Sequence, residues 1–269
     1  MVIMSQVIKE FKISKYFMFG IISGIVTQLF FATFKIVTLN AFVSGNEAAS
    51  PMNTSQTALY VWVTQMLFAI VPWNVNGKDF DSIRTGSIAS ELIRPVGLFK
   101  LIFVKTISWR MVSFLTRAIP IFFIASILFH LLSLDELIIQ LPTFGYFLMF
   151  LISVTFSLIL STLITVLLYS LAFFFTSISN FIGAISSLAF VLSGIIIPLA
   201  FYPKQLLFFL EHQPFKFIVD TPALIFNESY TIHDSIRQLI MQVIWIVVLL
   251  FITNLVYQKV ENKIEINGG

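Results

Sequence analysis

Few side chains in this sequence belong to the types that carry out catalysis. The chain has three histidines and no cysteine. This excludes disulfides, thiolate zinc sites and cysteine nucleophiles, and it leaves too few histidines for a metal cage. His130 and Asp135 have the H-x4-D spacing of some acyltransferases, but no second catalytic group accompanies them. An enzyme acting on lipids is therefore the weakest of three hypotheses for this chain.

Familiar catalytic and nucleotide-binding motifs are absent as well. The sequence contains no H-E-x-x-H, no G-x-S-x-G and no G-x-x-x-x-G-K-[ST]. It therefore predicts no hydrolytic site and no P-loop that could cradle nucleotide phosphates. We expect no catalytic residue, no metal site and no cofactor site in this chain.

Charged side chains avoid the apolar segments almost completely. All thirteen acids lie outside the spans proposed below, and only Lys35 and Arg117 lie inside them. Carriers driven by protons or sodium usually keep an ionisable group, often an acid, within the membrane. This distribution argues against a stand-alone secondary carrier or channel, the second hypothesis. Lys35 and Arg117 themselves can snorkel to a headgroup, pair with a neighbouring helix or contact a substrate.

Small and hydroxyl-bearing residues recur at helical spacing in two apolar segments. Ser153, Ser157, Ser161 and Thr165 follow one another every four residues, which places four hydroxyls along one stripe of a helix. Gly20 and Gly24 form a G-x-x-x-G pair, and small residues of this kind let helices approach closely. We expect helix packing at both places, with the lining of a transport pathway as the alternative for the hydroxyl stripe.

Composition identifies the kind of protein that holds these residues. Of the 269 residues, 58% are hydrophobic and only 11% are charged, and the mean hydropathy is +0.96. Soluble domains carry about 25% charged residues, so both a soluble and a disordered chain are excluded. A formal charge of +3 is too small for a nucleic-acid-binding surface. The sequence predicts one all-α integral membrane domain over residues 1–269.

Hydropathy divides this domain into six spanning helices. A span needs about 20 apolar residues, and such segments lie at 18–43, 57–73, 111–133, 144–175, 181–202 and 238–257. The fourth is long enough to reach about 48 Å, beyond the hydrocarbon core of about 30 Å, so it either tilts or projects into the cytoplasm.

Basic residues orient these spans. Segments 1–17, 74–110, 176–180 and 258–269 carry eleven of the sixteen Lys and Arg residues, whereas segments 44–56, 134–143 and 203–236 carry two. Lys and Arg concentrate on the cytoplasmic side of membrane proteins. We therefore expect the first group of segments, and both termini, to be cytoplasmic.

The N-terminal segment 1–17 has the pattern of an amphipathic helix. Met4, Val7, Ile8, Phe11 and Phe17 fall near one helical face, and the basic residues lie mostly elsewhere. A short helix lying in the inner headgroup layer fits this pattern. The alternative is an irregular basic tail that only orients the first span.

The cytoplasmic segment 74–110 is the most charged part of the chain. Asp81 and Ser82 can cap a helix, and Pro95 ends one because it disfavours helix at Arg94 and donates no hydrogen bond. A solvated loop would account for the basic residues but not for a helix between a cap and a proline. We therefore expect a short helix that docks on another protein.

Segment 203–236 is outside the membrane in this topology, yet much of it is apolar. It contains Pro203, Pro214 and Pro222 between runs such as LLFFL and PALIF. A water-exposed loop is normally more polar. We expect half-helices that dip into the outer leaflet or pack on helix ends, because irregular backbone at membrane depth must be covered by protein.

Three features together resemble the permease subunits of ABC-2-type exporters, in particular the branch known as ABC2_membrane_6. The first is six spans with both ends inside. The second is the loop, which resembles that branch's G…L-x-R-P signature at Gly86, Leu92, Arg94 and Pro95. The third is the run similar to its S-G…P-L…P…P-F…P pattern, at Ser193, Gly194, Pro198, Pro203, Pro214, Phe215 and Pro222.

The resemblance implies an ATP-driven exporter, which is the first hypothesis. Two permease subunits, identical or homologous, would pair, and two copies of a separate cytoplasmic ABC ATPase would bind the ATP and Mg. A coupling helix around 82–94 would dock on the ATPase, through Ile83, Arg84, Gly86, Glu91, Leu92, Arg94 and Pro95. The outer segment would close the exit, with Pro198, Pro203, Pro214, Phe215 and Pro222 in an extracellular gate.

The resemblance also implies a role for the N-terminal helix and a cellular location. The helix would link movement of the ATPase to the first span. The chain would be a multi-pass protein of a prokaryotic plasma membrane, in contact with membrane lipids and with no nucleic acid. The family exports lipids, polysaccharides, peptides and drugs, so it does not identify the cargo.

Overall fold

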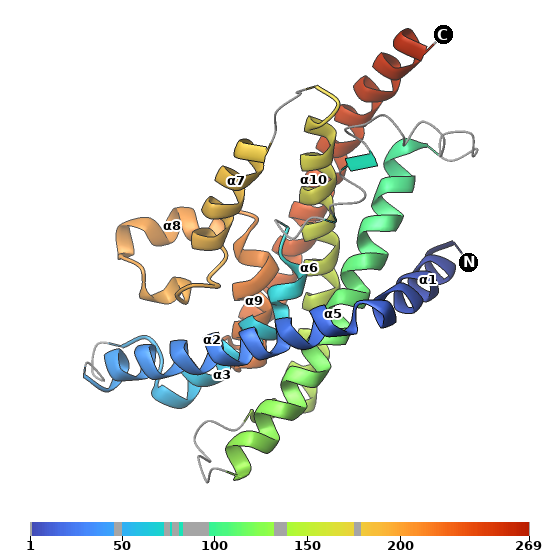
Figure 1. Ribbon diagram of the computed structural model, residues 1–269. Helices are drawn as coiled ribbons and strands as arrows, with labels where there is room; N and C mark the ends of the chain where they lie inside the picture. The colour runs from blue at the N-terminus through green and yellow to red at the C-terminus, as the bar shows by residue number, and fades with distance from the viewer. Residues whose placement is uncertain are drawn as a thin grey trace.

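The structure, a computed structural model, describes residues 2–45, 50–72, 76, 81–82, 97–131, 139–174 and 179–268. Within these ranges every regular element is a helix, as the sequence predicts (Figure 1). The elements are α1 (Val2–Tyr16), α2 (Met18–Ser44), α3 (Thr54–Leu67), the 3-10 turn η1 (Phe68–Ile70), α5 (Leu98–Leu131), α6 (Phe144–Leu171), α7 (Ser179–Leu192), the 3-10 turn η4 (Leu199–Phe201), α8 (Lys204–His212), α9 (Lys216–Phe226) and α10 (Ile232–Gly268).

Among the described residues, α2, α5, α6 and the Ile232–Glu261 part of α10 are long and apolar enough to cross a membrane. They correspond to the first, third, fourth and sixth predicted spans. Helices α3 and α7 overlap the second and fifth predicted spans, but each has only 14 residues. A perpendicular crossing needs about 20 residues, so these two helices are short for that role.

Helix α5 begins at Leu98, whereas the sequence predicted a span from residue 111 and assigned 98–110 to the cytoplasmic loop. The helix continues because residues 98–119 contain no glycine or proline, and basic residues alone do not break a helix. Its first turn is also capped from another helix, since Glu261 Oε1 of α10 accepts the Leu98 N–H at 2.9 Å. A carboxylate is favourable at this positive end of a helix.

Three long helices form the body of the molecule. In Figure 1, α6 lies beside α10 and α5, and α2 crosses this group obliquely with α1 continuing beyond it. Helix α1 packs on α5, and α2 packs on α3 and α5. The short helix α9 packs against both α6 and α3, so the segment that the sequence placed outside the membrane contributes to the main core.

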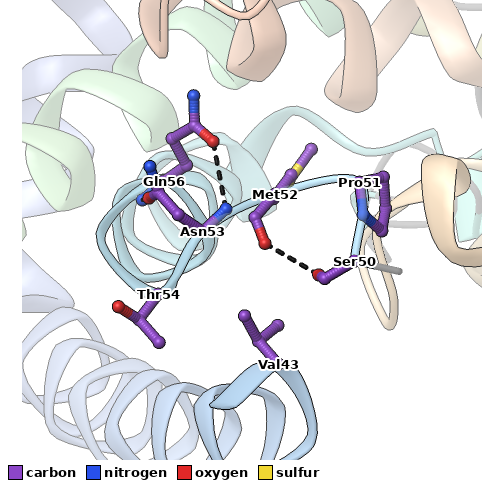
Figure 2. Close-up of a pocket in the computed structure, with 7 residues that line it drawn as sticks. All are labelled: Val43, Ser50, Pro51, Met52, Asn53, Thr54 and Gln56. Carbon is purple, nitrogen blue, oxygen red and sulfur yellow. Dashed lines mark hydrogen bonds between the residues drawn. The ribbon is translucent and has the colours of Figure 1, made fainter. Parts of the chain in front are cut away.

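Helix α3 is largely enclosed in this core. It starts at a capping box, in which Asn53 Oδ1 accepts the Gln56 N–H at 2.8 Å and Gln56 Oε1 accepts the Asn53 N–H at 3.1 Å. Figure 2 shows this turn beside a cavity of ≈ 410 Å³ at the α2–α3 connection. Beyond the cap, every side chain from Tyr60 to Leu67 is buried. A helix that is apolar all round has to be enclosed in this way.

Candidate functional site

The backbone that leaves α3 and η1 is held by one fully buried arginine. Arg110 lies on α5 with none of its surface exposed. One terminal guanidinium nitrogen, Nη1, donates to the carbonyl of Ile70 at 2.6 Å and to that of Val71 at 2.9 Å. Carbonyls at the end of a helix have no partner inside the helix. Arg110 supplies those partners from a neighbouring helix.

Two hydroxyls of the predicted stripe complete this arrangement. Arg110 donates to Ser161 Oγ and, at 2.7 Å, to Thr165 Oγ1, both on α6. Ser161 in turn donates to the Ile70 carbonyl, and Thr165 donates to the Pro72 carbonyl at 2.8 Å. These hydrogen bonds thus join α5, α6 and α3 with its η1 extension. They do so at residues 70–72, just before the charged segment that the sequence analysis placed at 74–110.

The loop returns to the membrane domain at a second anchored point. Here the Leu98 N–H is bound by Glu261, as described above, and Leu98 packs with Val166, Tyr169 and Tyr257 in a small apolar cluster. The Tyr257 hydroxyl donates to the Val166 carbonyl at 3.0 Å. Both ends of the loop, residues 70–72 and 97–98, are therefore fixed to α6 or α10.

The other two residues of the stripe are buried beside α9 and α10. Ser153 and Ser157 have no exposed surface. Ser157 donates to the Phe217 carbonyl of α9 at 3.0 Å, and Gln242 of α10 donates to the same carbonyl at 2.7 Å. All four stripe residues thus lie against protein within this chain, an arrangement that favours helix packing over a pathway lining.

A buried carboxylate organises the outer segment. Asp220 of α9 is 1% exposed, and its Oδ1 accepts the Tyr60 hydroxyl at 2.7 Å and the Leu199 N–H at 3.3 Å. The hydroxyl oxygen of Tyr60 also lies 2.9 Å from the carbonyl oxygen of Gly194. These contacts hold the non-helical backbone between α7 and α8 against α3 and α9.

Gly194 is required at this junction for two reasons. Its φ is +80°, a conformation that residues with a Cβ rarely adopt. A Cβ at this position would also lie 2.5 Å from the Tyr60 hydroxyl oxygen and 2.8 Å from Asp220 Oδ1. The turn can therefore approach the Tyr60–Asp220 pair only because residue 194 has no side chain.

Burial shifts the protonation of the charged groups of α9. It raises the pKa of the Asp220 carboxyl above its ordinary value, a shift that the nearby Lys216 ammonium and the hydrogen bonds from Tyr60 and Leu199 oppose. Burial also lowers the pKa of Lys216, with Asp220 as the first opposing influence. The two charges offset one another in a place where either alone would be costly.

The two cations predicted inside spans occupy different environments. Lys35 of α2 donates to the Ile195 carbonyl and so connects the first long helix to the turn that follows α7. Arg117 of α5 lies against α2, with its guanidinium carbon 3.7 Å from the position that a Gly24 Cβ would occupy. Lys35 thus has a structural partner, and Arg117 packs beside Gly24 of the G-x-x-x-G pair.

The gate prolines mark the ends and bends of the short outer elements. Pro198 and Pro203 immediately precede η4 and α8, Pro214 and Phe215 lie between α8 and α9, and Pro222 lies inside α9. The structure therefore has two short helices where half-helices were expected. Whether these residues act as a gate stays a prediction.

The residues assigned to ATPase docking lie outside the described part of the chain. These are Ile83, Arg84, Gly86, Glu91, Leu92, Arg94 and Pro95. Asp135 also lies outside it, and its expected partner His130 is exposed near the end of α5. What the structure does describe is a pair of fixed points on either side of these residues, at 70–72 and at 97–98.

Sequence reasoning missed two central residues of this arrangement. Arg110 was counted as one more cytoplasmic basic residue, because its residue type alone does not distinguish it from such a cation. Asp220 was counted as an acid outside the membrane because it lies between prolines in 203–236. The surrounding run PFKFIVDTPALIF is apolar enough to have indicated a buried acid.

Comparison with known proteins agrees with the helical, apolar character of the chain. A family model described as "ABC-2 family transporter protein" matches residues 29–268, which is nearly the whole chain and includes the undescribed docking segment. No curated protein matches the sequence.

Replacing Arg110 by methionine tests the anchor at the start of the loop. The change replaces the guanidinium by an unbranched apolar side chain, which removes the Arg110 donors to the Ile70 and Val71 carbonyls and leaves the Val71 carbonyl without its donor. We expect a loss of about 2–5 kcal/mol in stability, visible as a lower Tm of the purified protein in detergent. Lys100→Met, at an exposed position of the same helix, should change stability by less than about 0.5 kcal/mol. Equal Tm values for the two variants would show that the anchor is dispensable.

Gly194→Ala tests the outer junction. The positive φ and the contact with Tyr60 should together cost at least about 1 kcal/mol of stability. Gly183→Ala is the matched control, because Gly183 lies in α7 with no atom within 4 Å of its Cβ position. It should leave the Tm unchanged or raise it slightly. A Gly194→Ala protein as stable as the Gly183→Ala protein would contradict the described turn.

The raised pKa of Asp220 predicts a pH dependence. A carboxyl whose pKa is higher in the folded protein binds its proton more tightly there, so its contribution to stability is greatest below the ordinary value of 3.8 and is lost as pH rises through the folded value. The stability of the wild type relative to Asp220→Asn should therefore fall as pH is raised from 4. Parallel curves of Tm against pH would rule out this titration.

Proposed function

The chain belongs to the ABC-2 family of transporter proteins, and on this premise we propose that it is the permease subunit of an ATP-driven exporter that couples to a separate cytoplasmic ATPase. Membership of the family establishes a multi-pass transporter permease. The remaining parts of the proposal concern the topology, the ATPase and the second subunit, and they are argued in turn.

The family match over residues 29–268 is the observation that carries this proposal. It includes the loop in which the G…L-x-R-P signature occurs, at Gly86, Leu92, Arg94 and Pro95. In the proposal, this loop forms the coupling helix, and Ile83, Arg84 and Glu91 belong to the same docking surface. ATP and Mg are bound by the partner ATPase, present in two copies.

The anchoring of the loop supports a mechanical role for it. A loop that docks on a motor transmits movement only if its ends are attached firmly to the transmembrane helices. Here the backbone of residues 70–72, which precedes the loop, is bound by Arg110, Ser161 and Thr165. Helix α5, which follows the loop, is capped by Glu261. Movement imposed on the loop is therefore delivered directly to α5, α6 and α10.

We further propose six crossings with both termini in the cytoplasm of a prokaryotic cell. In this topology α3 with η1, and α7 with the turn after it, complete the crossings that the four long helices begin. The exit on the outer side is formed by η4, α8 and α9, with their prolines at the bends. A second permease subunit, identical or homologous, supplies the other half of the pathway.

Copurification tests the ATPase partner. We expect the full chain, extracted from its native membrane, to bring down a protein with a P-loop ATPase domain. Leu92→Asp and Arg94→Glu should each reduce the recovered ATPase by at least about tenfold, because a buried apolar contact or a charge pair lost at the centre of an interface costs about 1.4 kcal/mol or more.

Lys204→Glu provides the matched control for this experiment. It reverses an exposed charge on α8, at the opposite end of the proposed topology. Its ATPase recovery should equal that of the wild type. Normal recovery with the Leu92 and Arg94 variants would refute the docking assignment. Transport by the purified chain alone, driven by an ion gradient without ATP, would replace the whole proposal with a secondary carrier or channel.

A further inference from the structure

A cavity of ≈ 590 Å³ lies between α1, α2 and α5. Its described lining includes three cations, Lys9, Lys105 and Arg117, and one acid, Glu10. Glu10 accepts a hydrogen bond from Gln6 at 3.2 Å, also within α1. The described part of the lining therefore carries more positive than negative charge, and the cavity lies beside the N-terminal half of α5.

Arg117 is the most unusual member of this lining. It is half-buried, and it makes no hydrogen bond or ion pair with any residue in the part of the chain that the structure describes. A guanidinium removed from water without a partner is costly. Its position against Gly24 directs it to the junction of α2 and α5, so an anion entering the cavity can supply the missing partner.

The apolar part of the lining indicates what kind of anion fits. Phe17, Ile21 and Val112 border the cavity together with the indole of Trp109. Tryptophan is enriched where a membrane helix passes through the headgroup layer. A small soluble anion would gain little from these side chains, whereas a lipid has both a phosphate and an apolar body.

Helix α1 places this cavity at the depth of lipid headgroups. It turns Val7, which is buried, toward the protein, and it leaves Met4, Ile8 and Phe11 exposed along a stripe with helical spacing. An exposed apolar stripe on a short basic helix is typical of a helix lying in the membrane interface. The cavity under this helix is then in contact with the lipid layer.

We propose that this cavity binds the phosphate headgroup of an anionic phospholipid, with Arg117 pairing with the phosphate and Lys105 and Lys9 adding to the attraction. Arginine binds phosphate in a bidentate manner, and basic pockets between transmembrane helices are suited to lipid headgroups. The inference concerns a resident lipid rather than the cargo, and it does not depend on the ATPase assignment.

Native mass spectrometry of the full chain, after exposure to an equimolar mixture of phosphatidylglycerol and phosphatidylcholine, tests the proposal. The wild type should retain phosphatidylglycerol in preference. Arg117→Gln should reduce that retention by at least about fivefold, and Lys105→Gln should reduce it in the same direction. Arg117→Lys, which keeps the charge, should recover part of it. Counting lipids only on the intact folded mass removes misfolded protein from the comparison.

Lys100→Gln is the control for general attraction between basic residues and acidic lipids. It removes the same charge from an exposed position of α5 that does not line the cavity, and it should retain phosphatidylglycerol as the wild type does. Equal retention of the two lipids by the wild type, or unchanged retention by Arg117→Gln, would overturn the proposal. Displacement of phosphatidylglycerol by inorganic phosphate would also overturn it and would identify a soluble-anion site instead.

Discussion

Wherever a helix of this protein ends in apolar surroundings, the backbone N–H and carbonyl groups at its end need hydrogen-bond partners, and this requirement determines which side chains lie there. A helix that ends in water can leave its last carbonyls to the solvent, but a helix that ends in a membrane protein cannot. The end of α3 and η1 illustrates the solution adopted here. The guanidinium of Arg110 and the hydroxyls of Ser161 and Thr165 take the place of water for the carbonyls of residues 70–72.

The same need for hydrogen-bond partners is met in a different way around the turn after α7 and the bend between α8 and α9. After α7 the backbone turns at Gly194, where it contacts Tyr60 and Asp220. The bend between α8 and α9 is held by Gln213. The amide of Gln213 donates to the Leu192 carbonyl at 2.7 Å and accepts the Phe215 N–H at 2.7 Å. Non-helical segments at membrane depth are thus tolerated because side chains from distant parts of the sequence satisfy them. The two regions that the proposed function expects to move, the loop before α5 and the segment of η4, α8 and α9, are both attached at such points.

Hydropathy and helix-ending residues predicted much of the fold. They predicted the all-helical class, long apolar helices at 18–43 and 144–175 where the structure has 18–44 and 144–171, the amphipathic first helix, and the break of 203–236 into short helices. These features depend on local composition, which is available in a single sequence. Membership of the transporter family could likewise be recognised from the order of short motifs.

The polar contacts of the core could not be predicted in the same way. Ser161 and Thr165 were recognised as a stripe, but their partners are carbonyls ninety residues away in the chain, and a carbonyl carries no sequence signal. Arg110 has the same residue type as a cytoplasmic cation, and only its place in the packed structure distinguishes the two. The start of α5 was missed for a related reason, because Lys100, Lys105 and Arg110 lower the local hydropathy without interrupting the helix.

Helix α5 runs without a break from Leu98 to Leu131, so movement at one end can be transmitted along its length. Its 34 residues correspond to a rod of about 51 Å, one end of which is clamped by Glu261 near the loop. Pro120 lies inside this rod and cannot donate a hydrogen bond to the carbonyl of Thr116, so resistance to bending is lowest there. A twist applied at Leu98 is carried along the helix as far as Pro120, and bending concentrates there because Ile121, Ala125 and Phe129 beyond it are buried in the core.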